Sequence, residues 1–439
     1  MKILIKRYIL PAVLLFSLVP ACKMDTVNPN APTDEEVLTS REGIIALCVG
    51  MRQFWSTDGI EATTLYSGVT SREMKGVTTF TNVLELEAGG AGLPTFNGNV
   101  LGYWSRMQRL MLMAQDVLDN APNINTLSGG MRSGVLAYAS FFKALSIASL
   151  AQAFEQVNIN VNRDGNVTFV TRQQALTEAV RLLTEGISAV TADAPTGEFV
   201  STVSGSDFDL VNCLYAYRAR YQLYAGDYAG AIASANAVDL SKRCVYKYND
   251  RSLNPVYNRV IIAGDFKPRI HFGLPSGSGL YEPNDQRISF FTTGAVSVVN
   301  TDSIRVLSGF FTTQTSDIPV YLPDEMRLIK AESILRSNGS TTDALAEINA
   351  VRTQTSGDPF GIYPGLAAYA GDPSREALLV EVYRQRCAEL FLSGQKWEDT
   401  RRFNRPAAAA GGAERNRNFY PYPDQERLNN PNTPADPAI

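Results

Sequence analysis

The chain has 439 residues, of which 45% are apolar and 19% are charged, and its formal net charge is −4 at pH 7. This length and apolar content suit a folded protein with one large core or two ordinary ones. The slightly acidic balance excludes a polybasic surface as the main feature, so nucleic acid is not expected as a partner.

The first 21 residues have the pattern of a secretion signal. Lys2, Lys6 and Arg7 precede an apolar run of eleven residues at 9–19, ILPAVLLFSLV. As a helix this run would span about 16 Å, which is too short for a bilayer core of ~30 Å. The run is therefore typical of a cleaved signal peptide and not of a transmembrane helix.

The end of this signal resembles the lipobox of bacterial lipoproteins, since Val19, Pro20 and Ala21 lead directly to Cys22. The resemblance implies that Cys22 carries the lipid, palmitate included, and anchors the chain in the outer membrane, with the protein facing the exterior. The polar residues 22–41 then form a flexible tether. The alternative is an ordinary signal peptide in which the cysteine is incidental.

Helical periodicity dominates the remaining sequence. Apolar residues recur at three- and four-residue spacing near 42–56, 101–120, 131–156, 172–192, 209–225, 227–239, 322–337, 341–354, 375–393 and 395–404.

The clearest helix pair is 209–239, where Gly226 and Asp227 form the turn and small residues such as Ala219 and Ala231 allow close approach. This pair resembles a tetratricopeptide (TPR) unit. We predict a mainly α fold in a single domain at 42–439, with TPR-like pairs near 131–192, 209–239, 322–354 and 375–404.

Two stretches break the helical pattern. Residues 57–100 are irregular, and within 241–320 the runs RVII, RIHF and RISFF alternate in a way that predicts short strands. Binding residues are commonly carried by loops on a rigid scaffold. We therefore place the ligand-binding candidates mainly in these two stretches: Trp55, Tyr66, Arg72, Phe80, Phe96, Asn97, Tyr257, Phe272, Tyr281 and Asn284.

Motifs for catalysis or cofactors are missing from the sequence. The single histidine, His271, lies in one of the alternating runs, and no CxxC, HExxH or GxxxxGK pattern occurs. Catalytic triads and metal sites need partners that the chain largely lacks, so no metal and no cofactor are expected. Cys213 and Cys244 flank the 209–239 pair and are candidates for a disulfide, with free thiols as the alternative.

A glycosidase needs only two carboxylates, and two adjacent pairs exist. Glu85 and Glu87 alternate with leucines as on one face of a strand, and Glu398 and Asp399 fall in a predicted helix. We interpret both pairs as solvated charge, so catalysis is not expected.

The last third of the chain contains four segments in a fixed order: YLPDEMRLIKAESILRS at 321–337, ALAEINAVRTQTSG at 344–357, EVYRQRCAELFLSGQKWEDTRRF at 381–403 and YPYPDQERLNNPN at 420–432. In this order they resemble the SusD/RagB family of outer-membrane nutrient-binding lipoproteins. The same residues suit structural roles. Pro323, for example, is well placed in the first turn of a helix.

The resemblance implies capture of oligosaccharides at the cell surface and delivery to a TonB-dependent SusC/RagA-type barrel. Three alternatives stay open from the sequence: a peptide-binding lid of the same architecture, a surface glycosidase, and a TPR assembly lipoprotein without a small ligand.

Overall fold

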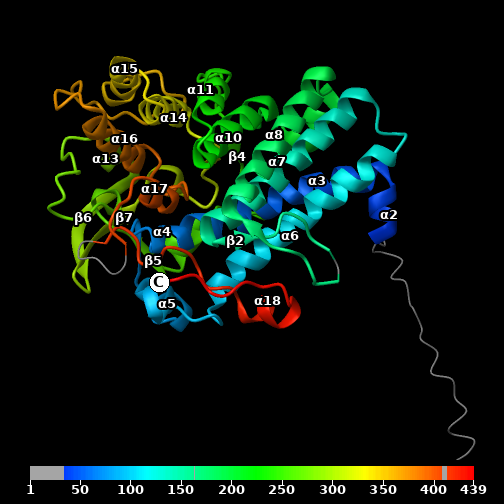
Figure 1. Cartoon of the computed structure of the whole chain (residues 1–439), viewed down its shortest axis with the longest axis horizontal. Helices are drawn as coiled ribbons and strands as arrows, with labels where there is room; N and C mark the ends of the chain where they lie inside the picture. The colour runs from blue at the N-terminus through cyan, green and yellow to red at the C-terminus, as the bar shows by residue number, and fades with distance from the viewer. Residues whose placement is uncertain (1–33, 163, 408–412) are drawn as a thin grey trace, which may run out of the picture.

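The computed structural model describes residues 34–162, 164–407 and 413–439, so the predicted signal, Cys22 and most of the tether lie outside the described residues. The described chain is mainly helical, which confirms the predicted fold class (Figure 1). Long helices lie side by side in one half of the molecule. The other half contains most of the short strands and the C-terminal helices except the last, α18 (Asp424–Asn429), which lies below the long helices.

A continuous helix runs from residue 41 to residue 70. It passes through α3 (Arg41–Phe54), two π-helical stretches, η1 (Trp55–Gly59) and η2 (Glu61–Tyr66), and α4 (Ser67–Thr70). The helix predicted at 42–56 is present, but the irregular structure predicted from residue 57 is wrong as far as residue 70. Gly59 and the threonines around it have low helix propensity, and burial against the core outweighs that propensity.

The stack of long helices forms the core of the first half: α6 (Gly98–Asn120), α7 (Gly129–Ala153), α8 (Arg172–Ala192), α10 (Leu210–Ala225) and α11 (Tyr228–Asn236). By length and composition α7 could cross a membrane, but 94% of its most apolar window is buried inside the protein. It is therefore a core helix. The predicted hairpin at 209–239 is present, because Gly226 leaves α10 with φ 81° and Asp227 caps α11.

The C-terminal helices are α14 (Pro323–Arg336), α15 (Thr341–Arg352), α16 (Arg375–Glu389), α17 (Lys396–Arg402) and α18 (Asp424–Asn429). Glu398 and Asp399, predicted as solvated, are buried instead. Asp399 accepts hydrogen bonds from Arg386 at 2.8 Å and Arg402 at 2.6 Å, and Glu398 accepts from Arg401 at 2.6 Å. Paired guanidinium groups compensate for the water that these carboxylates lose.

The strands of the described residues form four antiparallel pairs: β1 (Met74–Gly76) with β5 (Phe266–Pro268), β2 (Gln156–Val157) with β3 (Val170–Thr171), β4 (Val245–Tyr246) with β8 (Ile318–Pro319), and β6 (Thr292–Val299) with β7 (Asp302–Leu307). The shorter helical segments are α2 (Asp34–Thr39), α5 (Thr81–Ala88), η3 (Gly90–Gly92), η4 (Ala121–Asn123), α9 (Gly197–Phe199), η5 (Val200–Ser204) and η8 (Gly309–Phe311). Glu85 and Glu87 lie on α5, so the strand predicted for them is wrong.

The three alternating runs predicted as strands in 241–320 are mostly helical. RVII lies in the π-helical η6 (Asn258–Ile262), RIHF enters the 3-10 turn η7 (His271–Gly273), and RISFF forms α13 (Arg287–Phe291). Asn254 caps and Pro255 starts the short helix α12 (Pro255–Tyr257), which leads directly into η6. Runs of four or five apolar residues do not distinguish a strand from a buried helix.

Cys48, Cys213, Cys244 and Cys387 are buried free thiols. The disulfide considered for Cys213 and Cys244 is therefore not formed in this structure.

Replacing Trp397 with alanine is expected to lower the free energy of unfolding by about 3–5 kcal/mol, because the side chain is buried in the core. Its indole nitrogen donates to the Arg417 carbonyl at 2.9 Å, and its ring packs on Tyr420. Urea denaturation measures the change. The control Leu428→Ala removes an 84% exposed side chain and should change stability by about 0.5 kcal/mol at most. Equal unfolding midpoints for the two variants would contradict this packing.

Candidate functional site

Two segments that are far apart in the sequence come together on one face of the molecule. Strand β1 pairs with β5, so that Met74 lies opposite Pro268 and Gly76 lies opposite Phe266. Beside this pair the Arg269 N–H donates to the Glu73 carbonyl at 2.8 Å. Parts of 57–100 and 241–320, the stretches in which the sequence placed most ligand candidates, therefore lie together. We call the surface built by residues 72–97 and 266–302 the insertion face.

Five charged side chains join the two segments at this face. Glu87 accepts from Arg72 at 3.0 Å, Lys75 at 3.1 Å and Arg269 at 2.5 Å. Asp302 lies 2.9 Å from Lys75 and 3.0 Å from Arg269. Partial burial of Asp302 favours its neutral form, but hydrogen bonds from Arg269 and Lys75 prevail and hold its pKa at about 2. Three cations and two carboxylates leave a formal net charge of +1, with Arg72 the most exposed of the three cations.

The backbone beside this charge cluster is strained. Arg72, His271 and Phe272 have φ values of 65°, 60° and 56°, in the left-handed region that side chains other than glycine seldom occupy. The turns that contain them are pressed together, since a Cβ added at Gly273 would lie 2.3 Å from the Arg72 carbonyl oxygen. Strained residues held by their surroundings are frequent at binding sites, so these turns are candidates for ligand contact.

His271 and Tyr281 form an aromatic pair on the same face. Their ring centroids are 3.6 Å apart with an interplanar angle of 32°. Burial lowers the pKa of His271, so the imidazole is neutral at pH 7. The pair therefore presents a planar surface without charge.

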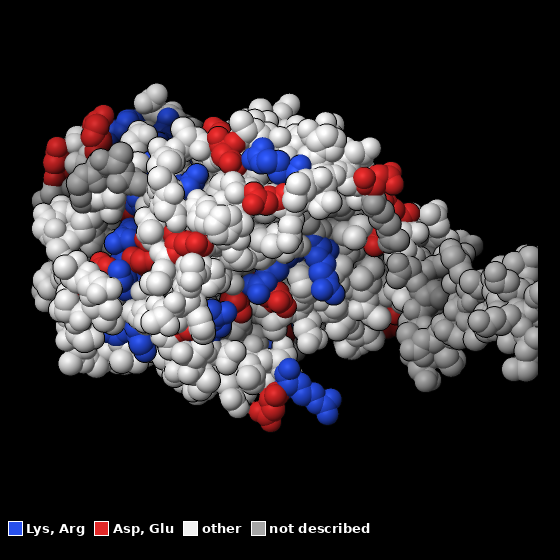
Figure 2. Space-filling view, turned by 90° about the horizontal axis from the view of Figure 1, so that it is seen from below, with Lys and Arg blue, Asp and Glu red and all other residues white. Residues whose placement is uncertain are grey.

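Two phenylalanines extend into solvent where α5 and α6 begin. Phe80 is 58% exposed and Phe96 is 70% exposed. Asn97, next to Phe96, ties the start of α6 to α5, since its side-chain amide donates to the Asn82 carbonyl at 2.9 Å and to Glu85 at 2.8 Å. Across this part of the molecule positive and negative side chains are interspersed among uncharged ones (Figure 2).

The structure separates the ten ligand candidates into two groups. Trp55, Tyr66, Asn97 and Phe272 are at most 5% exposed and have structural contacts, for example Asn97 as the cap of α6. Their burial does not suit them to contact a ligand at the surface. Exposed or half-buried are Arg72, Phe80, Phe96, Tyr257, Tyr281 and Asn284. Of these, Tyr257 lies apart from the insertion face on α12.

Sequence reasoning missed Lys75, Arg269 and Asp302, and it did not pair His271 with Tyr281. The only signal for Lys75 and Arg269 is their position in the short segments MKG and FKPRI, where apolar residues predominate, and the polar segment NTDS offers none for Asp302. Among the described residues no group of three or more His, Cys, Asp or Glu side chains could hold a metal ion.

No protein-family model and no curated protein matches the chain by sequence. Solved structures do match. A SusD superfamily protein from Bacteroides thetaiotaomicron has a TM-score of 0.70 and 12% identity, covering 90% of this chain and 99% of its own. SusD-like carbohydrate binding proteins from Bacteroides fragilis and Bacteroides vulgatus both have a TM-score of 0.65. Their identities are 15% and 14%, and they cover 90% and 87% of this chain and 99% and 85% of their own. The chain therefore has the SusD-like fold that its C-terminal segments predict.

The buried carboxyl group of Glu73 supports a prediction about pH. Leu392 N–H and the Ser71 hydroxyl donate to it, each at 3.0 Å, and burial raises its pKa to about 7 although Lys396 opposes this shift. The folded chain therefore keeps this proton between pH 4.5 and about 7, whereas the unfolded chain loses it, so raising the pH through this window destabilises the fold. Glu73→Gln should gain roughly 2–3 kcal/mol of stability relative to the native chain from pH 4.5 to pH 8.

Urea unfolding across this pH range measures the difference. The control Glu155→Gln changes an exposed carboxylate and is expected to show no such trend, because that group is in water before and after unfolding. If the difference in unfolding free energy between Glu73→Gln and the native chain stays constant across this pH range, burial does not raise the pKa of Glu73.

Proposed function

We propose that this chain, which has a SusD-like fold, binds oligosaccharides on its insertion face and does not transform them chemically. The observation that carries the proposal is the likeness, over about nine tenths of the chain, to structures described as SusD-like carbohydrate binding proteins. The identities of 14% and 15% establish the fold alone, so the ligand has to be argued from the side chains.

The side chains of the insertion face suit a neutral, hydroxyl-rich ligand. Sugar rings present C–H faces that stack on aromatic rings, and the exposed rings of Phe80 and Phe96 are available for this contact. Sugar hydroxyls bind planar amide and guanidinium groups, which Asn284 and Arg72 supply. Because the neighbouring cations and carboxylates are paired with one another, little uncompensated charge is left to attract an ionic ligand.

The carboxylates of this face are poorly placed for glycoside hydrolysis. A hydrolase needs a general acid that has a raised pKa and reaches the substrate. The pKa of Asp302 is lowered to about 2, and Glu73, whose pKa is raised, is only 1% exposed. Glu87 accepts from three cations and Glu85 accepts from the Asn97 amide. These contacts give the carboxylates structural roles in the face, which supports binding without catalysis.

Delivery to a transporter is the second part of the proposal. The sequence around Cys22 supports a lipid anchor in the outer membrane, and the ordered C-terminal segments support a role beside a TonB-dependent SusC/RagA-type barrel. A lipid anchor would hold the protein at the outer membrane beside such a barrel, so that a captured oligosaccharide could pass inward.

Calorimetric titration with a panel of oligosaccharides is expected to identify at least one that binds. Phe80→Ala and Phe96→Ala should each weaken that binding about fivefold, because an aromatic contact contributes about 1 kcal/mol. The control Val211→Ala removes an exposed apolar side chain on α10, away from the insertion face, and should leave the affinity unchanged. Heat from peptides alone would refute the carbohydrate proposal, and unchanged affinities in both phenylalanine variants would place the site elsewhere.

Cys22→Ala is expected to abolish labelling of the chain by palmitate and its recovery with outer membranes. The native chain, purified in detergent, should bring a TonB-dependent barrel with it. Cys48→Ala provides the matched control, since Cys48 is buried in α3 and cannot carry a lipid. Palmitate labelling that survives in Cys22→Ala would refute the anchor.

A further inference from the structure

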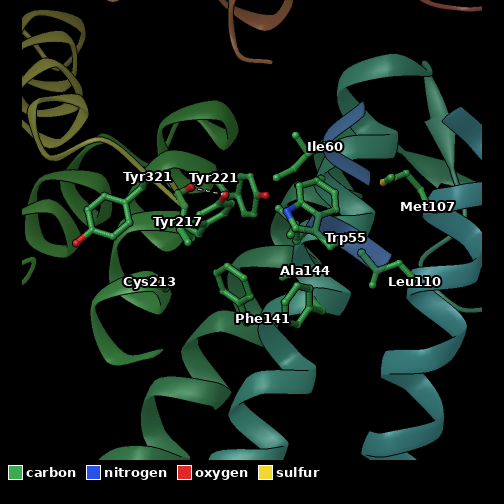
Figure 3. Packing of buried hydrophobic residues seen from close by; sticks show 14 of the residues in the cluster. Trp55, Ile60, Met107, Leu110, Phe141, Ala144, Cys213, Tyr217, Tyr221 and Tyr321 are labelled. Atoms are coloured by element: carbon green, nitrogen blue, oxygen red, sulfur yellow. Dashed lines mark hydrogen bonds between the residues drawn. The ribbon is translucent and has the colours of Figure 1, made fainter. Parts of the chain in front are cut away.

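A cavity of about 70 Å³ lies where several segments of the chain meet, and neither Phe80 nor Phe96 lines it. The long N-terminal helix contributes Trp55 and Ile60, α10 contributes Tyr217, β4 contributes Tyr246, and the segment before α17 contributes Leu392 and Gln395. In Figure 3 the indole nitrogen of Trp55 lies on the side of the ring that faces Tyr217. The walls are largely apolar and aromatic, with a few polar atoms among them.

The charges that line the cavity neutralise each other. Arg220 binds Glu325 through two parallel hydrogen bonds of 2.6 Å, and its guanidinium group lies 4.1 Å from the centre of the Tyr217 ring. Such a bidentate pair is complete without a further ion. An uncharged ligand therefore fits this cavity better than an anion or a cation.

Three polar side-chain atoms at the cavity have no hydrogen-bond partner within the described part of the chain: Trp55 Nε1, Tyr246 Oη and Gln395 Nε2. All three side chains are at most 5% exposed. The amide of Gln395 is oriented by its oxygen, which accepts from Tyr224 at 2.9 Å and from Arg386 at 3.2 Å. Buried polar atoms without partners are costly. Two of these atoms are N–H donors and the third is a hydroxyl that can donate or accept, so together they point to a ligand that both accepts and donates hydrogen bonds.

The other two tryptophans of the chain provide a comparison. Trp104 donates to Glu426 at 2.9 Å, and Trp397 donates to the Arg417 carbonyl at 2.9 Å. Only the indole of Trp55 lacks a partner among the described residues. Trp55 also begins a π-helical stretch, a feature that is frequent at functional sites.

The size of the cavity limits the ligand to a small group. A cavity of about 150 Å³ admits benzene, with six heavy atoms, so about 70 Å³ admits three or four heavy atoms. A sugar ring is too large to enter. Half-buried Thr63, Phe310 and Pro319 and exposed Ser393 also line the cavity, so it opens to solvent between them. A larger molecule can insert a substituent there and keep its ring outside.

We propose that this cavity binds the acetyl group of an acetylated ligand, such as an N-acetylated sugar. The methyl group packs on Ile60 and Leu392. The carbonyl oxygen accepts from Trp55 Nε1 and Gln395 Nε2, and the amide N–H donates to Tyr246 Oη. The sugar in this inference rests on the proposed function, whereas the acetyl group rests on the cavity alone.

The indole N–H signals of the chain, labelled with ¹⁵N-tryptophan, provide the test. The sequence has three tryptophans, and Trp55→Phe and Trp104→Phe assign their signals. N-methylacetamide and N-acetylglucosamine are expected to shift the Trp55 signal until it saturates, and to leave Trp104 and Trp397 in place. Glucose, which lacks the acetyl group, should leave the Trp55 signal unchanged.

The same probes give affinities for variants. Trp55→Phe should weaken binding of N-acetylglucosamine roughly tenfold, because one hydrogen bond to a buried acceptor is lost. Trp104→Phe, which leaves the cavity intact, should bind as the native chain does. Ile60→Phe fills the cavity without removing a donor and should abolish the shift by N-methylacetamide, so a folding defect in one variant does not decide the result.

The outcomes separate the two proposals. Oligosaccharide binding without any shift of Trp55 by N-methylacetamide would overturn the acetyl pocket and leave the proposed function standing. A saturable Trp55 shift by N-methylacetamide in a chain that binds no sugar would overturn the proposed function and support the pocket. Equal shifts of all three indole signals would show a general solvent effect and overturn the pocket.

Discussion

Arg386 and Asp399 are almost completely buried, and their ion pair at 2.8 Å fixes α17 against α16. A charge that has left water is tolerated only beside its partner in a specific geometry, so each such pair restricts how two elements can pack. Arg287 imposes the same restriction between α13 and α16, through Glu389 at 3.1 Å. Replacing Arg386 would leave the buried Asp399 with Arg402 as its remaining cationic partner. Replacing Glu389 would leave Arg287 with Asp285, so each buried network loses part of its compensation when one member is removed.

Residues 392–396, at the start of α17 and just before it, connect these buried ion pairs to the insertion face. The N–H of Leu392 donates to Glu73, next to the strained Arg72, and Lys396 donates to the carbonyl of the strained Phe272 at 3.0 Å. Gly394 permits the close approach, since a Cβ there would lie 2.6 Å from the Thr63 carbonyl oxygen. The C-terminal segment 381–403 thus has a structural role, because it holds in place the two turns that contain Arg72 and Phe272.

The sequence alone predicted the helix ends that local chemistry determines. Gly226 and Asp227 mark the turn between α10 and α11, and Pro323 starts α14, because left-handed backbone, capping and a fixed φ are local properties. The helix from 57 to 70 was missed since tertiary burial overrides the low propensity of its glycine and threonines. The burial of Glu398 was missed because its partners come partly from α8, through Arg172. Likewise, nothing local indicates that β1 pairs with β5, so ligand candidates could be predicted from the sequence, but not which of them share a face.

The pairing of charges also decides what kind of ligand the molecule can hold. At the insertion face Glu87 and Asp302 neutralise most of the charge of Arg72, Lys75 and Arg269, and at the cavity Glu325 neutralises Arg220. The groups left over are aromatic rings, amides and an indole N–H, which bind neutral, acceptor-rich molecules.

The cavity and the insertion face are also close in space. Phe391 lines the cavity and packs on Phe272 of the strained turn, with their ring centroids 5.5 Å apart and the ring planes at 67°. The same ring that closes one side of the cavity therefore also supports the turn that carries His271, so the packing of one phenylalanine contributes to both places.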